Sequence, residues 1–203
     1  MSDWLDIIRK KAPSHCPAND TLDQAEAGVL MAITDHPEPH IVLTQRAMHL
    51  NSHAGEVAFP GGKREHQDSD IIETALRESH EEICLAPMEV EVVSPMPPSV
   101  SKMGLKVVPI LGIIPHHADL LACEDEIASI FKVPIRFFLD NPVEQFTERE
   151  HEGVRYRIPC YRYEGYEIWG LTAYFITDCF NRLFDTGLDM PVAKPISGSH
   201  RAS

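Results

Sequence analysis

The sequence has no long hydrophobic run. No segment approaches the roughly 18 consecutive apolar residues that a membrane-spanning helix needs. The first residues carry acidic side chains early and lack the apolar region of a signal peptide. We therefore expect a protein that has no membrane partner and resides in the cytoplasm.

Cysteine is scarce, with five residues that are far apart and form no C-x-x-C pair. An odd number of distant cysteines argues against both a disulfide framework and a zinc site, and free thiols fit a reducing compartment. The chain also lacks a G-x-S-x-G elbow, a phosphate-binding P-loop and a G-x-G-x-x-G turn. Serine hydrolases and dinucleotide oxidoreductases therefore have no support.

Positive charge is in deficit. The 203 residues include 18 Lys and Arg against 31 Asp and Glu, which gives a formal net charge of −13. Such a balance argues against nucleic acid as a partner, because a nucleic-acid binder needs a basic surface. An anionic small-molecule substrate would need a metal ion or a local basic patch.

The order of expected elements favours one domain. We expect an N-terminal helical extension over 1–26, the domain over 27–185 and a flexible tail over 186–203 that is rich in Gly, Pro and Ser. Strands and helices mix without strict alternation. This mixture predicts an α/β fold of the α+β type, with a mixed β-sheet sandwiched between helices.

Hydrophobic periodicity and turn residues place the elements. Helices are expected over 3–11, 71–85, 124–131 and 171–184, and strands over 27–34, 41–44, 56–59, 89–93, 106–114, 154–163 and 166–169. The last two strands should form a hairpin, and the proline-rich stretch 94–99 should be a loop. In the second helix, the apolar stripe is expected to consist of Ile72, Leu76, Ser79 and Ile83, with Ala75 beside it.

The same helix carries an acidic cluster. Glu78, Glu81 and Glu82 share an arc of about 100° on a helix, and Arg77 is the only nearby cation in the sequence. Like charges four residues apart cost a few tenths of a kcal/mol. A solvated acidic face is the usual explanation, whereas a hard ion such as Mg²⁺ or Mn²⁺ would neutralise the cluster. The residues alone leave both explanations open.

A Gly61-Gly62 turn before the helix adds a second feature, since adjacent glycines let the backbone approach a ligand closely. Together the two features resemble the Nudix box, because Gly62 is followed after five residues by Asp68 and after eight more by Arg77-Glu78-x-x-Glu81-Glu82. The box departs from the family pattern in three ways. Asp replaces Glu at 68 with one extra residue after it, Ser79 replaces an aliphatic residue, and Cys84 stands where glycine would accept a left-handed helix end.

The preceding stretch narrows the resemblance. Leu43-Thr44-Gln45-Arg46, followed by Leu50-x-x-His53-x-Gly55-x-x-x-Phe59-Pro60-Gly61-Gly62, is similar to the signature of the coenzyme A diphosphatase branch. The expanded box and its Asp are usual in that branch. Further similarity at 125–127, 133–134 and 168–173 extends the resemblance over about residues 27–180.

The resemblance implies hydrolysis of the coenzyme A pyrophosphate to 3′,5′-ADP and 4′-phosphopantetheine with Mg²⁺ or Mn²⁺. It also implies a homodimer. Glu78 and Glu82 are the implied metal ligands. Glu81 would share a metal or position water, and the Gly61 carbonyl would be a further ligand. Arg77 would orient the glutamates, and Glu126 is our first candidate for the general base, with Glu81 second.

A protein of this charge must hold coenzyme A's extra 3′-phosphate locally. The basic residues that flank the expected site are Arg46, Lys63, Arg64, Lys102 and Lys106, of which Arg46 and Arg64 are our substrate-binding candidates. His53 either braces the glycine-rich loop or simply packs. Two alternatives stay open: a Nudix hydrolase of ADP-ribose, NADH or an oxidised nucleoside triphosphate, and a catalytically silent Nudix-fold binding module.

Overall fold

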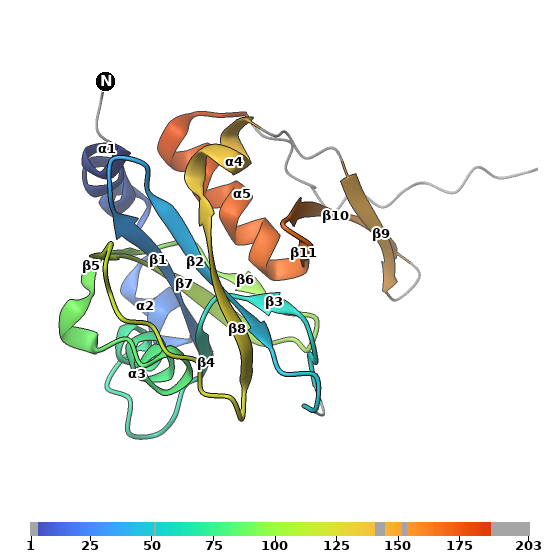
Figure 1. Cartoon of the computed structure of the whole chain (residues 1–203), viewed down its shortest axis with the longest axis horizontal. Helices are drawn as coiled ribbons and strands as arrows, with labels where there is room; N and C mark the ends of the chain where they lie inside the picture. Colours follow the sequence, from blue (N-terminus) through green and yellow to red (C-terminus); the bar gives the residue numbers. More distant parts are fainter. Residues whose placement is uncertain (1–3, 51, 141–144, 152–153, 188–203) are drawn as a thin grey trace, which may run out of the picture.

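The computed structural model describes residues 4–50, 52–140, 145–151 and 154–187 (Figure 1). The α-helices are α1 (Trp4–Lys11), α2 (Asn19–Asp23), α3 (Ile71–Ile83), α4 (Ile135–Asp140) and α5 (Gly170–Phe184), with 3₁₀ turns at Ala12–His15 and Pro87–Glu89. The strands are β1 (Ala27–Asp35), β2 (His40–Arg46), β3 (Val57–Ala58), β4 (Gly61–Lys63), β5 (Glu91–Pro95), β6 (Ser99–Val100), β7 (Lys106–Pro115), β8 (Ile127–Pro134), β9 (Gln145–His151), β10 (Val154–Tyr163) and β11 (Tyr166–Ile168).

A mixed sheet with the order β3-β2-β1-β7-β5 forms the centre (Figure 1). β1 runs parallel to β7 along its whole length and antiparallel to β2. β4 pairs with the start of β1, and β8 pairs with β2. The start of β1, the end of β2 and the short β4 therefore meet at one end of the sheet.

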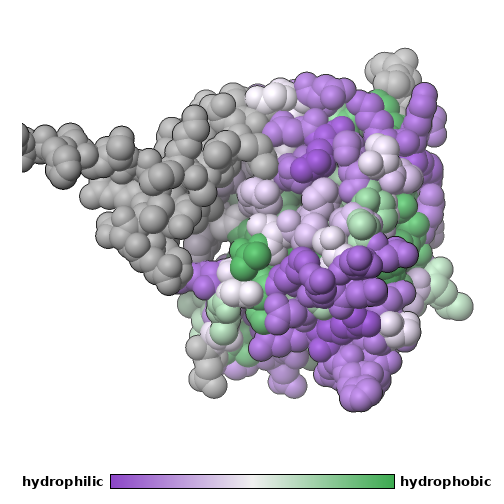
Figure 2. Space-filling view, turned by 180° about the vertical axis from the view of Figure 1, so that it is seen from behind, coloured by the Kyte–Doolittle hydropathy of each residue, from purple (hydrophilic) through white to green (hydrophobic). Residues whose placement is uncertain are grey.

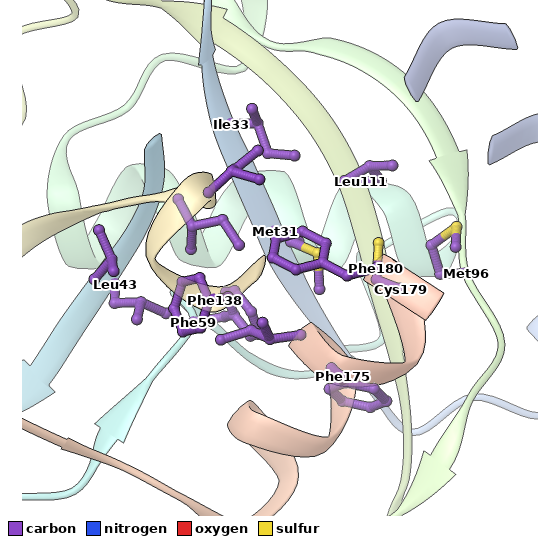
Figure 3. Close-up of a cluster of buried hydrophobic side chains, with 14 of the residues drawn as sticks. Met31, Ile33, Leu43, Phe59, Met96, Leu111, Phe138, Phe175, Cys179 and Phe180 are labelled. Carbon is purple, nitrogen blue, oxygen red and sulfur yellow. The ribbon is translucent and has the colours of Figure 1, made fainter. Parts of the chain in front are cut away.

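Side chains of β1 enter two separate cores, one on each face of the sheet. Leu30 and Ala32 pack in the cluster that includes residues of α3, whereas Met31 and Ile33 pack in the cluster that includes residues of α5. Figure 3 shows the second cluster, which includes Met31 of β1 and Phe180 of α5. Full burial of such a side chain contributes about 1.5–3 kcal/mol. The predicted sheet between helices is confirmed.

Helix α1 lies where the sequence predicts it. Its buried residues Leu5 and Ile8 belong to the same core cluster as α5, and Trp4 meets Phe184 edge to face at 5.2 Å. On the exposed side, Arg9 forms two hydrogen bonds of 2.8 Å with the carboxylate of Glu91. The N-terminal segment thus packs against the rest of the fold.

The predicted helix over 124–131 is wrong. A turn over 124–126 leads into β8, which pairs with β2 through Leu43↔Phe131 and Ile41↔Val133. The β-branched and aromatic residues of this segment suit a half-buried strand, and a free strand edge on β2 outweighs the local helical pattern.

The proline-rich stretch is only partly a loop. β5 extends to Pro95, and Ser99–Val100 forms β6 against the start of β7. Proline is tolerated in β5 because this strand lies at the end of the sheet order, and its register shifts between Val92 and Ser94. The sequence did not predict α2, α4, β4 or β9.

The buried stripe of α3 differs from the predicted one. Ile71, Ala75, Ser79, Glu82 and Ile83 are buried, whereas Ile72 and Leu76 are only partly buried. The helix can approach β1 this closely because Gly28 has no side chain. A Cβ atom at Gly28 would lie 2.6 Å from the carbonyl oxygen of Ile71.

The predicted hairpin of β10 and β11 is confirmed, with Tyr163 opposite Tyr166. Its turn residues Glu164 and Gly165 both have positive φ, as a two-residue hairpin of this type requires. The expected tail over 186–203 lies almost wholly outside the described residues.

The face in Figure 2 is mostly hydrophilic, in keeping with the acidic composition. Within the described part of the chain, no helix is both long and apolar enough to cross a membrane.

Candidate active site

Helix α3 is capped at both ends. The Asp70 carboxylate accepts a 2.8 Å bond from the amide of Glu73, and Cys84 ends the helix in the left-handed conformation with φ of 55°. The carbonyls of Glu82 and Ile83 accept bonds from the backbone of the segment that leads to β8. The C-terminal, acidic half of α3 is therefore hydrogen-bonded to the segment that carries Glu126.

Asp68 is buried and holds Arg77. The guanidinium donates from Nε to Asp68 Oδ1 at 2.9 Å and from Nη2 to Oδ2 at 3.1 Å. The amide of Glu65 and the hydroxyl of Thr74 also donate to this carboxylate. The Arg77 contact, more than any other, lowers the pKa of Asp68 to about 2. Asp68 is shorter than the Glu of the family pattern and is followed by one extra residue, yet its carboxylate still contacts Arg77.

Arg77 also contacts two of the glutamates. Its Nη2 donates to Glu78 Oε1 at 3.1 Å and to the carbonyl of Lys63 at 3.2 Å, and its Nη1 donates to Glu81 Oε2 at 3.0 Å. A guanidinium with this many fixed partners has little freedom to turn toward another ligand. An orienting role for Arg77 remains a prediction, and such a role requires hydrogen bonds like these to Glu78 and Glu81.

Glu82 is 3% exposed, and each of its carboxylate oxygens has a partner. Oε2 accepts from the Gly61 amide at 3.1 Å, and Oε1 accepts from Arg46 Nη1 at 3.2 Å. Burial, helped by the charges of Glu78 and Glu126, raises the pKa of Glu82 to about 7 against the effect of these two donors. The Glu82 carboxylate is therefore desolvated, and the positive charge near it does not offset this burial.

Glu78 lies over Gly62. A Cβ atom on Gly62 would fall 2.4 Å from the carboxyl carbon of Glu78, so any other residue would displace this acid. Burial raises the pKa of Glu78, Arg77 opposes the shift, and the charges of Glu81 and Glu126 add to it. The Glu78 carboxylate can therefore occupy this position only because Gly62 has no side chain.

Glu126 reaches the cluster from a turn rather than from the expected acidic helix. Its carbonyl accepts a 2.8 Å bond from the Ala47 amide, and its Oε2 lies 3.7 Å from Arg46 Nη2. The Glu126 side chain is 52% exposed. Arg46 thus contacts both Glu82 and Glu126, whereas Glu78 and the 56% exposed Glu81 bond to Arg77.

The remaining candidates lie apart from these acids. Arg64 donates to the carbonyls of Asp23 and Ser69, and Ser69 precedes the start of α3, at the end opposite Glu82. His53 has φ of 56°, and its Nδ1 lies 2.7 Å from Glu56 Oε2. Both residues belong to the loop between β2 and β3, so this contact lies within the loop.

The acids fit a hard divalent ion by their chemistry. Among the described residues, no three His, Cys, Asp or Glu side chains are already arranged around one point for a metal. Even so, Glu78 and Glu82 offer only oxygen donors, their raised pKa values show a lack of positive charge, and Gly62 leaves room beside them. Such donors suit Mg²⁺ or Mn²⁺.

Sequence reasoning missed the contact between Arg46 and Glu82. These residues are 36 positions apart and come from a strand and a helix that meet only in the folded chain. No local signal in the sequence indicates this contact.

The family model of the NUDIX domain matches residues 24–155, which include all of these acids. This chain belongs to the Nudix hydrolase family. Nudix enzymes are pyrophosphohydrolases that act on nucleoside diphosphate derivatives and generally use divalent metal ions, and this chain is one of them.

Relatives share much of its length. The uncharacterized Nudix hydrolase NudL of Salmonella paratyphi B is 40% identical over 155 residues, which cover 76% of this Nudix chain and 81% of the relative. The NudL protein of Salmonella newport gives the same values. Among solved structures, the Nudix hydrolase RenU of M. smegmatis is 18% identical with a TM-score of 0.48, covering 58% of this chain and 74% of RenU.

Proposed function

We propose that this Nudix enzyme hydrolyses the pyrophosphate of coenzyme A, or of a derivative, to 3′,5′-ADP and 4′-phosphopantetheine. One observation carries the proposal. The segment that resembles the coenzyme A diphosphatase signature, residues 43–62, is the segment that contacts the acidic cluster. Its Arg46 and Gly61 both bond to Glu82, and its Gly62 makes room for Glu78.

The proposed metal is Mg²⁺ or Mn²⁺, held by Glu78 and Glu82, with Glu81 and the Gly61 carbonyl as further ligands. When bound, such an ion lowers the pKa of the attacking water and neutralises charge on the phosphoryl oxygens. Arg77 acts as a positioning residue, because its bonds to Glu78 and Glu81 fix where these carboxylates point.

Glu126 is the proposed general base. It is exposed enough to meet water, and it lies beside Arg46 at the edge of the cluster. Glu81 is the alternative, although Arg77 already occupies one of its oxygens. Loss of a general base lowers kcat by about 10²–10⁴. Glu126→Gln should therefore lower kcat by this factor while it retains metal binding. Glu81→Gln also changes a proposed metal ligand and should bind Mn²⁺ more weakly.

Arg46 and Arg64 remain the proposed substrate-binding cations, with His53 as the brace of the loop after β2. Of the two arginines, Arg46 has the stronger support, because its guanidinium lies at the acidic cluster, whereas Arg64 bonds to backbone carbonyls near the start of α3. A homodimer is also part of the proposal, and sedimentation velocity tests it.

Product analysis tests the activity. The protein is incubated with coenzyme A and Mg²⁺ or Mn²⁺, and the products are separated by chromatography, with Glu82→Gln in parallel. The proposal predicts 3′,5′-ADP and 4′-phosphopantetheine in the presence of metal, and no turnover by the variant. The Glu82→Gln side chain is almost the same size as the original, so folding is preserved.

The other outcomes separate the alternatives. Cleavage of ADP-ribose, NADH or an oxidised nucleoside triphosphate instead of coenzyme A would keep the family and reject the proposed substrate. A folded, metal-loaded protein that cleaves none of them would point to a silent binding module.

A further inference from the structure

Both carboxylate oxygens of Glu82 already have donors from the chain itself. The Gly61 amide holds Oε2, and Gly61 belongs to β4, where it pairs with Val29 of β1. Arg46 Nη1 holds Oε1 through a side chain alone. A divalent ion that binds Glu82 can therefore replace Arg46 by a side-chain movement, whereas replacement of the amide would disturb the sheet.

The backbone of Arg46 is fixed by hydrogen bonds, whereas its side chain lies within reach of two carboxylates, those of Glu82 and Glu126. Its amide donates to the Glu56 carbonyl at 3.0 Å, and its carbonyl accepts from the Gly55 amide at 3.1 Å. The β2–β8 register shifts between Gln45 and Arg46, where β8 has one extra residue, and such a bulge increases the local twist of the paired strands. From this fixed point the guanidinium reaches Glu82 at 3.2 Å and Glu126 at 3.7 Å.

We propose that Arg46 is the resident cation of the acidic cluster and that a divalent ion displaces its guanidinium from Glu82, which frees it beside Glu126 for the phosphates of the substrate. A divalent ion and a guanidinium that share Oε1 repel each other at short range, which favours movement of the guanidinium away from Glu82. The phosphate-binding group thus becomes available only after the metal has bound. This inference deepens the proposed function and rests on its metal dependence.

Calorimetric titration with Mn²⁺, without substrate, tests the competition. We compare the wild type with Arg46→Met and with Arg9→Met, which removes an arginine from the exposed pair with Glu91 and lowers the formal charge by the same unit. Loss of a competing charged hydrogen bond should tighten Mn²⁺ binding about tenfold in Arg46→Met. Arg9→Met should change it less than about twofold, as expected for an exposed pair. Unchanged or weaker binding in Arg46→Met overturns the inference.

A second readout uses the wild-type protein, so that it holds even if Arg46→Met fails to fold. The Nε–Hε signal of Arg46 in a ¹H–¹⁵N NMR spectrum, assigned with Arg46→Lys, should shift as Mg²⁺ saturates the site, with the same midpoint as metal binding. Saturation without a shift overturns this inference alone. A wild-type protein that binds neither Mg²⁺ nor Mn²⁺ overturns the inference together with the proposed function.

Discussion

The guanidinium of Arg77 donates two hydrogen bonds, of 2.9 and 3.1 Å, to the buried carboxylate of Asp68. The loop between β4 and α3 is one residue longer than the family pattern, yet it brings an acid to the arginine. The same guanidinium bonds to Glu78 and Glu81, so the start of the box is joined to its acidic end through one side chain.

Replacement of Asp68 should therefore affect both stability and catalysis. Asp68→Asn removes the charge that faces Arg77 and leaves a buried donor without its acceptor, which should cost about 1–3 kcal/mol of unfolding free energy. It should also lower kcat, because Arg77 loses its anchor. Asp70→Ala is the matched control, since it removes only the helix cap, at a cost of about 1 kcal/mol. Equal effects on kcat in both variants would contradict the anchoring role.

The same pair predicts how stability depends on pH. The pKa of Asp68 falls from 3.8 to about 2, chiefly through its bond with Arg77. Because the folded pKa lies below the unfolded one, this contribution of about 2 kcal/mol is complete above about pH 4 and is lost as the pH falls toward 2. Urea unfolding at a series of acidic pH values measures it. Asp68→Asn should show a flatter pH dependence, and a slope equal to that of the wild type would contradict the assignment.

Gly62→Ala should impair the site more than the fold. The added Cβ would overlap the carboxylate of Glu78, while no positive φ at this position penalises alanine. Glu78 must then move from its place beside Glu82. We expect Mn²⁺ affinity and kcat to fall at least about tenfold with a stability loss of about 1–2 kcal/mol, within the range for overpacking. Gly104→Ala, where open space surrounds the added methyl group, should leave Mn²⁺ affinity unchanged.

Cys84→Gly should stabilise the protein. Cys84 has φ of 55° at the end of α3, where a side chain costs about 1–2 kcal/mol and glycine does not. Glycine's greater freedom in the unfolded chain offsets part of the gain, so the expected increase is about 0.5–1 kcal/mol. Urea unfolding midpoints provide the measurement. Cys84→Ala keeps the Cβ atom and should show no gain, so equal stabilisation by both variants would rule out the backbone explanation.

Local patterns predicted α3 from its helical periodicity, and β1 and β7 from their long apolar runs. They failed at 124–131, where the acids Glu124 to Glu126 suggest a helix start but the strand edge of β2 offers the following residues better pairing. The shift of the α3 stripe has a similar cause, since the approach to Gly28 decides which side of the helix is buried.

The acids of the site were found through their spacing on one helix. Arg46 and Glu126 were also named as candidates, but the contacts of Arg46 with Glu82 and Glu126 were not predicted, because these residues come from segments far apart in the chain. Such contacts depend on sheet pairing, and periodicity holds no information about which strands pair.

A competition assay tests the central claim most directly. Coenzyme A, 3′-dephospho-coenzyme A, ADP-ribose and NADH are mixed at equal concentrations with the wild-type enzyme and Mg²⁺, and mass spectrometry follows the loss of each. We predict that coenzyme A disappears first and yields 3′,5′-ADP and 4′-phosphopantetheine. In Arg46→Met, the difference between the rates of loss of coenzyme A and of its 3′-dephospho form should become smaller. Preferential loss of ADP-ribose or NADH, with coenzyme A left intact, would contradict the account.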